Sequence, residues 1–329
     1  MMTCYFREND AFKPILIDVP TTNPHADVAA MWFELLNPTP EEDRLVESIL
    51  GISIPTREEM EEIESSARLY TEAGAEFMTV TILTDLDTDH PGRTPVTFIL
   101  KGSRLVTVRY ADPRPFKTFI GGLQRPNRYA TGELIMLGLL EATIDRLADV
   151  LENTSNNIDA ISREVFRSNS QAGRRNTRNL QTVIEQIGRK GDLLGLARES
   201  LVSLSRLLTY HRALDIENPK LTKEARQQTK VLQRDVASLS DHDSFLSAKL
   251  SFLLDATLGL INLEQNQIIK IFSVAAVVFL PPTLVASIYG MNFDFMPELD
   301  WFFGYPFAIF LMIASAILPY MYFKRRGWL

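Results

Sequence analysis

The C-terminal end of the chain holds its strongest hydrophobic pattern. Two apolar runs, Ile271–Tyr289 and Trp301–Phe323, flank the short polar segment Gly290–Asp300. As a helix that rises 1.5 Å per residue, a run of about 20 residues crosses a hydrocarbon core of roughly 30 Å. The pattern therefore predicts two transmembrane helices, the first over about 268–289 and the second over 301–323.

The charges around the two runs predict their orientation. The loop 290–300 has no basic residue, whereas bases flank the runs at Lys270, Lys324, Arg325 and Arg326. The loop instead carries three acids, which would concentrate cations around it: Asp294, Glu298 and Asp300. By the positive-inside rule, the N-terminal part and the basic tail 324–329 face the cytoplasm, and the loop faces outside. The segment Met1–Asp10 has no apolar region of the kind found in signal peptides.

Residues 131–242 follow a helical period. Apolar residues recur seven positions apart in two stretches, with a polar turn over Ser168–Asn179 between them. The two rows are Leu137, Ile144, Leu151, Ile158 and Val165, then Leu180, Ile187, Leu194, Leu201 and Leu208. They predict an antiparallel helical hairpin in which these residues serve packing. A connecting helix is expected over about 222–239, followed by a break and a helix cap at Ser240–Asp243.

Residues 1–130 have the mixed pattern of a cytoplasmic α/β domain. Strands are expected at three apolar stretches, the last one split by a turn at Gly102-Ser103: Met31–Leu36, Glu76–Leu83 and Pro95–Tyr110. A capping box from Thr39 to Glu42 opens a helix that Gly51 ends, and the same device recurs from Thr56 to Glu59. About 130 residues suffice for a separate hydrophobic core.

A stalk helix is expected over 243–289, because no proline or turn signal interrupts the chain between Asp243 and Pro281. It would be roughly 70 Å long and would need partners along its length. Two rows with a spacing of seven form an a/d-type seam on this helix: Asp255, Asn262, Ile269, Ala276 and Thr283, with Gly259, Asn266, Ser273, Leu280 and Ser287. These ten residues are called the seam below.

Two interpretations of the seam remain open. Polar groups within a membrane usually face a partner or water, so the seam is a candidate lining for an ion path. Alternatively, small residues let helices pack closely, with Ser and Thr bonded to their own backbone. Two helices enclose no lumen, so an ion path requires several copies of the chain around an axis. Pro281 and Pro282 would loosen the helix near its outer end.

Composition narrows the classes of function. The net charge of -7 argues against a nucleic-acid partner, which would need a basic face. Cys4 is the only cysteine, so a disulfide framework or a CxxC zinc site within one chain is excluded. The four histidines have no metal-ligand spacing, and no phosphate loop, serine elbow or Cys/His pair is present. We therefore expect neither catalytic residues nor an enzyme.

The external loop and its surroundings resemble a known family. The tripeptide Gly-Met-Asn at 290–292 lies within Pro281–Phe293, precedes Met296–Leu299, and the chain ends with the basic segment Phe323–Leu329. This combination resembles the CorA family of magnesium and cobalt transporters, especially its proteobacterial members. The specific match covers about Ser251–Leu329, and the upstream plan matches the family in layout.

The resemblance implies a fold, an assembly and a location. An α+β cytoplasmic domain is followed by a mainly α-helical hairpin, a long stalk helix and two transmembrane helices. Five such chains form a homopentameric funnel. The protein would lie in the lipid bilayer of the bacterial plasma (inner) membrane, crossing it more than once, with both termini in the cytoplasm.

The resemblance also assigns roles to residues. The selectivity filter falls at Gly290, Met291 and Asn292. Pore-lining positions of the family match Asp255, Asn266 and Thr283, whereas Asn262 and Ser273 are pore-lining candidates on the seam alone. A hydrophobic gate is implied at Ile269, Phe272 and Leu280, and a basic collar at Lys324, Arg325 and Arg326. Residues expected to hold the ion, through its water shell at the filter, are Asn292, Gly290, Asn266 and Asp255.

The implied function is influx of Mg²⁺, and also of Co²⁺ and Ni²⁺, down the electrochemical gradient. Mg²⁺ dehydrates reluctantly, so neutral oxygens of Asn292 and Gly290 suit a hydrated ion. No cofactor is expected beyond Mg²⁺ as the transported and the regulatory ion, and cytoplasmic Mg²⁺ would gate the pore. Candidate regulatory acids lie in Glu58–Glu64 and Asp85–Asp89.

Two alternatives to Mg²⁺ transport remain. Relatives of the same fold that transport Zn²⁺ typically carry Gly-Ile-Asn where this chain has Gly-Met-Asn, so the motif favours magnesium. From a different class, a membrane-anchored sensor without transport would need the same two anchoring helices. Such an anchor would not explain the polar seam.

Overall fold

The computed structural model describes residues 1–8, 11–17, 30–86, 88, 91–123, 129–167, 177–217, 222–291, 296–297 and 301–327. The chain divides into two compact units. The first comprises Met1–Ala172 and Thr182–Leu253, and the second comprises Gly173–Gln181 and Leu254–Leu329. The division near residue 254 falls within a helix and not in a loop.

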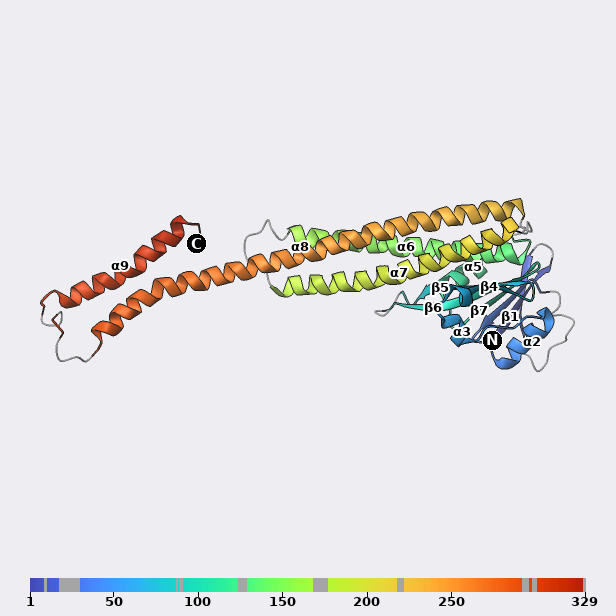
Figure 1. The fold of residues 1–329 in the computed structure, drawn as a ribbon, viewed down its shortest axis with the longest axis horizontal. Coiled ribbons are helices and arrows are strands. Elements are labelled where there is room, and N and C mark those ends of the chain that lie inside the picture. Colours follow the sequence, from blue (N-terminus) through green and yellow to red (C-terminus); the bar gives the residue numbers. More distant parts are fainter. Residues whose placement is uncertain are drawn as a thin grey trace. The chain divides into compact units, whose positions relative to one another are not determined.

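The first unit contains a seven-stranded sheet (Figure 1). Its strands are β1 (Met2–Glu8), β2 (Ala11–Ile17), β3 (Trp32–Leu36), β4 (Leu69–Glu72), β5 (Ala75–Thr84), β6 (Gly92–Lys101) and β7 (Arg104–Arg109). The order across the sheet is β2-β1-β3-β7-β6-β5-β4. All neighbours are antiparallel except β3 and β7, which run parallel with Trp32 opposite Leu105.

Helices cover both faces of this sheet, since most of its strands are apolar on both faces. The helices are α2 (Pro40–Leu50), α3 (Arg57–Glu61), α4 (Ser65–Arg68), α5 (Arg114–Gly122), α6 (Gly132–Arg167), α7 (Thr177–Glu217) and the first part of α8 (Lys223–Tyr289). On one face, Phe33 of β3 belongs to the same core as Val46 of α2 and Met60 of α3. On the other face, Trp32 meets Phe119 of α5 edge-on at 6.1 Å between ring centroids.

Both predicted capping boxes are confirmed. The Thr39 hydroxyl accepts a hydrogen bond from the Glu42 amide at 3.3 Å, and the Glu42 carboxylate accepts one from the Thr39 amide at 2.8 Å. Thr56 and Glu59 repeat the pair with the same two distances. Gly51 ends α2 with a φ of 62°, in the left-handed region that glycine enters without a steric penalty.

Three strands, β1, β2 and β4, were missed in the sequence. β2 and β4 form the two edges of the sheet, and their described side chains are partly or fully exposed on both faces, so an apolar alternation is weak. Leu16 of β2, for example, is 64% exposed. β1 pairs with both β2 and β3, and this pairing buries Met2 and Cys4 completely. Pairing with neighbouring strands, and not a local pattern, therefore identifies these strands.

The predicted helical hairpin is confirmed in α6 and α7. His211 near the end of α7 bonds to Glu133 at the start of α6, so the two helices run antiparallel. Every residue of the two predicted rows is at most 6% exposed. These leucines and isoleucines therefore serve packing, as their spacing indicates.

Helix α8 runs without a break from Lys223 to Tyr289, 67 residues or about 100 Å. The predicted break and cap at Ser240–Asp243 are therefore wrong. The Ser240 hydroxyl donates to the Val236 carbonyl four residues back, at 2.8 Å, as hydroxyls do inside helices. Asp243 is 1% exposed on its side chain and pairs with Arg198 of α7 at 3.0 Å. The side chains that the sequence pattern assigned to a cap thus bond to the backbone of α8 itself, as Ser240 does, or to a neighbouring helix, as Asp243 does.

The second unit holds the rest of α8 and the helix α9 (Gly304–Arg325). α8 continues through Pro281 and Pro282, so the two prolines do not end it. α9 begins at Gly304 and not at Trp301, because a turn precedes it in which the Trp301 carbonyl accepts from the Gly304 amide at 2.8 Å. Both predicted apolar runs are thus helical over most of their length.

Candidate functional site

Both helices of the second unit carry an apolar stretch that is long enough to span a membrane. Only 6% of each stretch is buried within the chain. The core helix of a water-soluble protein would be mostly buried. The exposed apolar side chains of α8 and α9 therefore fit a lipid environment.

All ten residues of the seam are exposed in the single chain. They include the large apolar side chains of Ile269, 62% exposed, and Leu280, 65% exposed. Ile269 and Leu280 lie on the same face as the polar residues Asn266 and Ser273, so this exposed face is mixed in character. Packing among the described residues therefore does not account for the residue types of the seam.

The shielded face of α8 lies on the opposite side of the helix. Val274 is 4% exposed, and Val278 and Val285 are partly buried on the same side. At about 100° of rotation per residue, this row lies nearly opposite the seam. In α9, the small residues Gly304 and Ala308 are the buried positions, four residues apart, which is a spacing that permits close approach of helices. One face of α8 is thus shielded, whereas the seam is exposed.

The outer end of α8 leads into the candidate filter. The Gly290 amide donates to the Ala286 carbonyl at 2.9 Å and ends the helix. A Cβ added at Gly290 would lie 3.0 Å from that carbonyl oxygen, so a larger residue would require a shift of a few tenths of an ångström. Met291 follows and is 46% exposed. The other loop candidates, Asn292, Asp294, Glu298 and Asp300, lie outside the described residues.

The pore and gate candidates along α8 differ in what surrounds them. The Thr283 hydroxyl donates to the Phe279 carbonyl at 2.8 Å, which is the arrangement expected from simple helix packing. Its oxygen lone pairs still face outward as acceptors. Phe272 is 72% exposed and directly precedes Ser273 of the seam. Asp255 and Asn262 are exposed at the cytoplasmic end of the same seam.

The basic cluster closes the C-terminal end of α9. Lys324 and Arg325 lie in its last turn, where positive charge interacts favourably with the helix dipole. The Lys324 ammonium lies 6.0 Å from the ring centroid of Tyr320, and the Arg326 guanidinium 5.7 Å from that of Tyr322. These local contacts hold the basic side chains at one end of the span.

The two acid-rich stretches already have local roles. Glu59 closes the capping box of α3, and Glu61 pairs with Arg57 at 3.1 Å. The Asp85 backbone carbonyl accepts from Thr88, which closes a turn, while part of the stretch after it lies outside the described residues. Over the described part of the chain, no three acids, histidines or cysteines gather as a set that would hold a metal ion.

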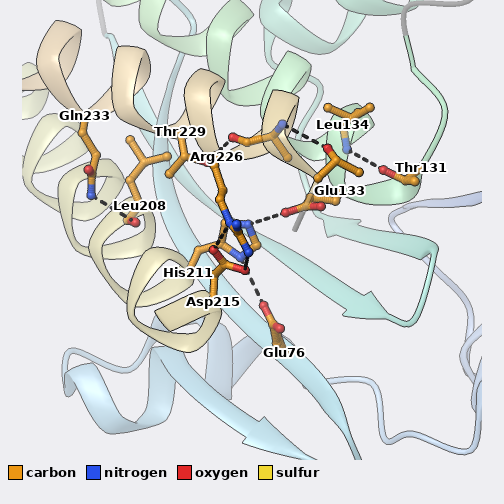
Figure 2. Close-up of polar contacts among 12 residues, drawn as sticks. Glu76, Thr131, Glu133, Leu134, Leu208, His211, Asp215, Arg226, Thr229 and Gln233 are labelled. Carbon is orange, nitrogen blue, oxygen red and sulfur yellow. Dashed lines mark hydrogen bonds and ion pairs between the residues drawn. The ribbon is translucent and has the colours of Figure 1, made fainter. Parts of the chain in front are cut away.

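One polar cluster was not found by sequence reasoning. His211 of α7 is 2% exposed and lies between two carboxylates, Glu76 of β5 at 3.1 Å and Glu133 of α6 at 3.0 Å (Figure 2). Burial alone would lower the pKa of His211, but the hydrogen bonds and negative charges of Glu133 and Glu76 outweigh it and raise the pKa to about 9. The three residues lie 78 and 135 positions apart in sequence, so no local pattern connects them.

The architecture defines an α+β domain with a helical hairpin and a two-helix membrane anchor whose first helix, α8, exposes a polar seam. The family described as CorA-like Mg²⁺ transporter protein matches residues 28–325. The chain is 39% identical over 311 residues to the magnesium transport protein CorA of Yersinia pestis, and 38% over 305 residues to that of Escherichia coli strain K12. These alignments cover 92% of this chain and 92% and 93% of the relatives. The chain therefore belongs to the CorA-like Mg²⁺ transporter family.

Two solved structures share the fold over the whole chain. The CorA magnesium transporter of Methanocaldococcus jannaschii has a TM-score of 0.75 at 19% identity and covers 100% of this chain and 99% of its own. The full-length CmaX protein has a TM-score of 0.65 at 14% identity, with 100% and 98% covered. The fold predicted for the single chain is confirmed, and the chain is an inner-membrane protein with two transmembrane helices.

Proposed function

We propose that this protein carries Mg²⁺ into the cell through a pore that several copies of α8 form around a common axis. The observation that carries this proposal is the seam, whose polar and small residues are exposed on the face turned away from the shielded side of α8. An assembly of several chains would cover this face. The names of the bacterial relatives, magnesium transport proteins, support Mg²⁺ as the ion.

The proposed assembly is a homopentamer with α8 inside and α9 toward lipid. The family resemblance supports the number five, because the seam by itself only requires more than two copies. α9 suits the outer position, since it has no charged residue before Lys324 at its end. The basic collar of five copies would then surround the cytoplasmic mouth.

Along the proposed path, the acids of the loop 290–300 attract the ion to the entrance, and neutral oxygens then hold it at the filter. Asn292 and Gly290 would hold a hydrated Mg²⁺ through its water shell, because this ion dehydrates reluctantly. Asn266 and Ser273 offer further neutral groups along the seam. The membrane potential drives the flow, since a divalent ion gains about 4.6 kcal/mol per 100 mV crossed, twice the value for a single charge.

The proposed gate lies where the seam becomes apolar. Rings of Ile269, Phe272 and Leu280 would exclude water from a narrow pore and so block hydrated ions. Mg²⁺ bound to acids between neighbouring chains would favour this closed state, with Glu58–Glu64 and Asp85–Asp89 as candidate acids. Co²⁺ and Ni²⁺ are proposed as surrogate ions for the same path.

The test is ion flux into liposomes that contain the full chain, with and without a membrane potential. Asn266→Leu should lower the Mg²⁺ flux by about tenfold or more, because every copy then carries an apolar group in the path. The matched control is Gln267→Leu, the same kind of change one residue further, rotated by about 100° away from the seam. Asn292→Ala should abolish uptake while the oligomer stays intact on size-exclusion chromatography.

Three outcomes would contradict the proposal. Equal flux in the two leucine variants would remove the pore from the seam. Normal uptake by Asn292→Ala would remove the filter from the loop. Flux of Zn²⁺ in preference to Mg²⁺, Co²⁺ and Ni²⁺ would identify a zinc transporter, and no flux of any divalent ion would favour a membrane-anchored sensor.

A further inference from the structure

A hollow of about 170 Å³ lies between the sheet and α7 in the first unit. Its floor is β5, through Thr79 and Thr81, and its walls are α4 and α7. Two arginines from different elements line it, Arg68 at the end of α4 and Arg206 of α7. The hollow is remote from the seam in sequence and shares no residue with it.

Among the described residues, no carboxylate pairs with either arginine of this hollow. Arg68 donates only to uncharged acceptors, the Thr81 hydroxyl at 3.2 Å and the Glu62 backbone carbonyl. Over the described residues, Arg206 makes no ion pair or hydrogen bond. The one carboxylate that lines the hollow, Glu199, is paired with Arg93 of β6. Glu199 is thus the one lining carboxylate for the three guanidinium groups of Arg68, Arg93 and Arg206.

The electrostatics at Arg68 agree with this count. Burial lowers the pKa of the Arg68 guanidinium, and the positive charges of Arg93 and Arg206 lower its pKa further. Cations held together without counter-ions repel one another, so the arrangement favours an anion from solution. The Ser203 hydroxyl already donates to the Ser200 carbonyl at 2.9 Å, and the Thr79 hydroxyl is bonded to the Thr97 hydroxyl at 2.8 Å. The guanidinium groups are therefore the donors left for a ligand.

The geometry points to a phosphate group as the ligand of this hollow. A phosphate monoester carries a charge of about −1.5 to −2 near neutral pH, which matches the two unneutralised guanidinium groups. Its tetrahedral oxygens can accept from two arginine forks at once, which the planar carboxylate does less well. Either inorganic phosphate or the phosphate of a small metabolite supplies this group.

The side chains at the rim of the hollow would contact a phosphorylated metabolite but not inorganic phosphate. Ile63 is 90% exposed and Val202 is 43% exposed, and both line the opening. An organic group attached to the phosphate would cover these apolar side chains and remove them from water. A nucleoside monophosphate has this combination of one phosphate and a flat, partly apolar body. Inorganic phosphate would use the arginines alone.

Binding is tested by isothermal titration and by ³¹P NMR on the full-length protein in detergent, without divalent ions. Inorganic phosphate should bind at one site per chain. Arg206→Gln should weaken binding by about tenfold or more, the effect of one lost charge-assisted hydrogen bond. Arg189→Gln is the matched control, because Arg189 is also exposed on α7 but lies outside the hollow.

A second variant distinguishes weaker binding from a loss of folding. Arg68→Lys keeps the charge of Arg68 but loses its fork, so it should weaken binding while the thermal midpoint without ligand stays unchanged. No binding up to millimolar phosphate, or equal weakening by Arg206→Gln and Arg189→Gln, would overturn the inference. Neither readout involves ion flux, so the outcome is independent of the proposed transport function.

Adenosine monophosphate and adenosine distinguish the two sources of phosphate. Tighter binding of the monophosphate than of inorganic phosphate identifies a metabolite site that uses Ile63 and Val202. Equal binding of the two identifies a site for the phosphate group alone. Adenosine that binds as tightly as its monophosphate would overturn recognition through the arginines.

Discussion

Side chains of similar size differ in this protein by what covers them. Leu137 and Leu208 in the helical hairpin are fully buried, whereas Leu280 of the seam is 65% exposed. The rows of the helical hairpin and the seam both have a spacing of seven residues. Spacing alone therefore does not distinguish a core position from a position on an exposed face. The other residues of the row distinguish the two, because burying Asn266 and Ser273 in an apolar core without hydrogen-bond partners would cost free energy.

His211 shows how a single residue joins distant elements. Its imidazole bonds to Glu76 of the sheet and to Glu133 of α6, while Arg226 and Asp215, which pair at 2.6 Å, lie close by (Figure 2). The pKa of about 9 means that the ring carries its positive charge at neutral pH. A charged ring between two carboxylates therefore ties α7 to both elements.

This ion cluster predicts a loss of stability in alkaline solution. The folded pKa of about 9 lies above the ordinary value of 6.5, so the contribution is fully present below pH 6.5 and is lost as the pH rises through 9. The total is about 3 kcal/mol by linkage. Thermal unfolding of the full chain between pH 6.5 and 9.5 should show a fall in midpoint that His211→Gln largely removes.

The control for this prediction is His242→Gln, since His242 stacks beside Phe245 and, among the described residues, forms no hydrogen bond with a carboxylate. It should keep the pH dependence of the unmodified protein. The same fall in His211→Gln as in the control would show that other groups cause it.

Among the elements, α8 departs most from its sequence pattern. The cluster Ser240–Asp243 has the residue types of a helix cap, yet the helix passes through it. Asp243 is buried and faces Arg198, and Lys249 of the same helix pairs with Asp159 of α6. Contacts with α6 and α7 therefore hold this part of α8 in helical conformation.

A proline at position 241 distinguishes a continuous helix from two helices that meet. In a continuous helix, Asp241→Pro removes one backbone hydrogen bond and clashes with the preceding turn, at a cost of about 3 kcal/mol. At the first position of a new helix, the same proline would be tolerated. We expect a clear loss of stability in chemical denaturation, because α8 is continuous.

Asp241→Ala is the matched control for the proline variant. Asp241 is exposed, so alanine should change the free energy of unfolding little. A proline variant as stable as the alanine variant would mean that the helix ends at Ser240 after all.

At the scale of the whole molecule, the proposed oligomer predicts opposite outcomes for the seam and for the shielded face of α8. The shielded face of α8, with Val274 and Val278, is covered within the chain, while Ser273 one residue away is exposed. If the proposed oligomer forms, Ser273 of neighbouring chains would approach at the axis and Val278 would stay apart. Chemical cross-linking measures this difference directly.

Ser273→Cys in the full-length protein should form covalent dimers with a short bifunctional thiol reagent, and Val278→Cys should not. Cys4 does not interfere, because it is fully buried. Native mass spectrometry of the same samples should give the mass of five chains. Stronger cross-linking from position 278 than from 273 would place another face of α8 at the axis.

Much of the plan of this protein follows from its sequence. The apolar runs of about 20 residues determine the two membrane spans, because no other environment accepts so long an exposed apolar helix. The rows of Leu and Ile determine the helical hairpin, and Thr39 and Thr56 determine where two helices begin. These signals are local and periodic, so they are visible before any folding. The roles of the seam and of the loop at 290–292 stay predictions.

Other features were decided only by tertiary structure. The edge strands β2 and β4 exist through pairing, and the continuity of α8 at Asp243 depends on Arg198, which lies 45 residues earlier. The His211 cluster and the arginine-lined hollow join residues from three or more elements, and no spacing along the chain encodes them. Local sequence specifies helices and spans because neighbours along the chain decide them, whereas charges that meet across elements depend on the complete fold.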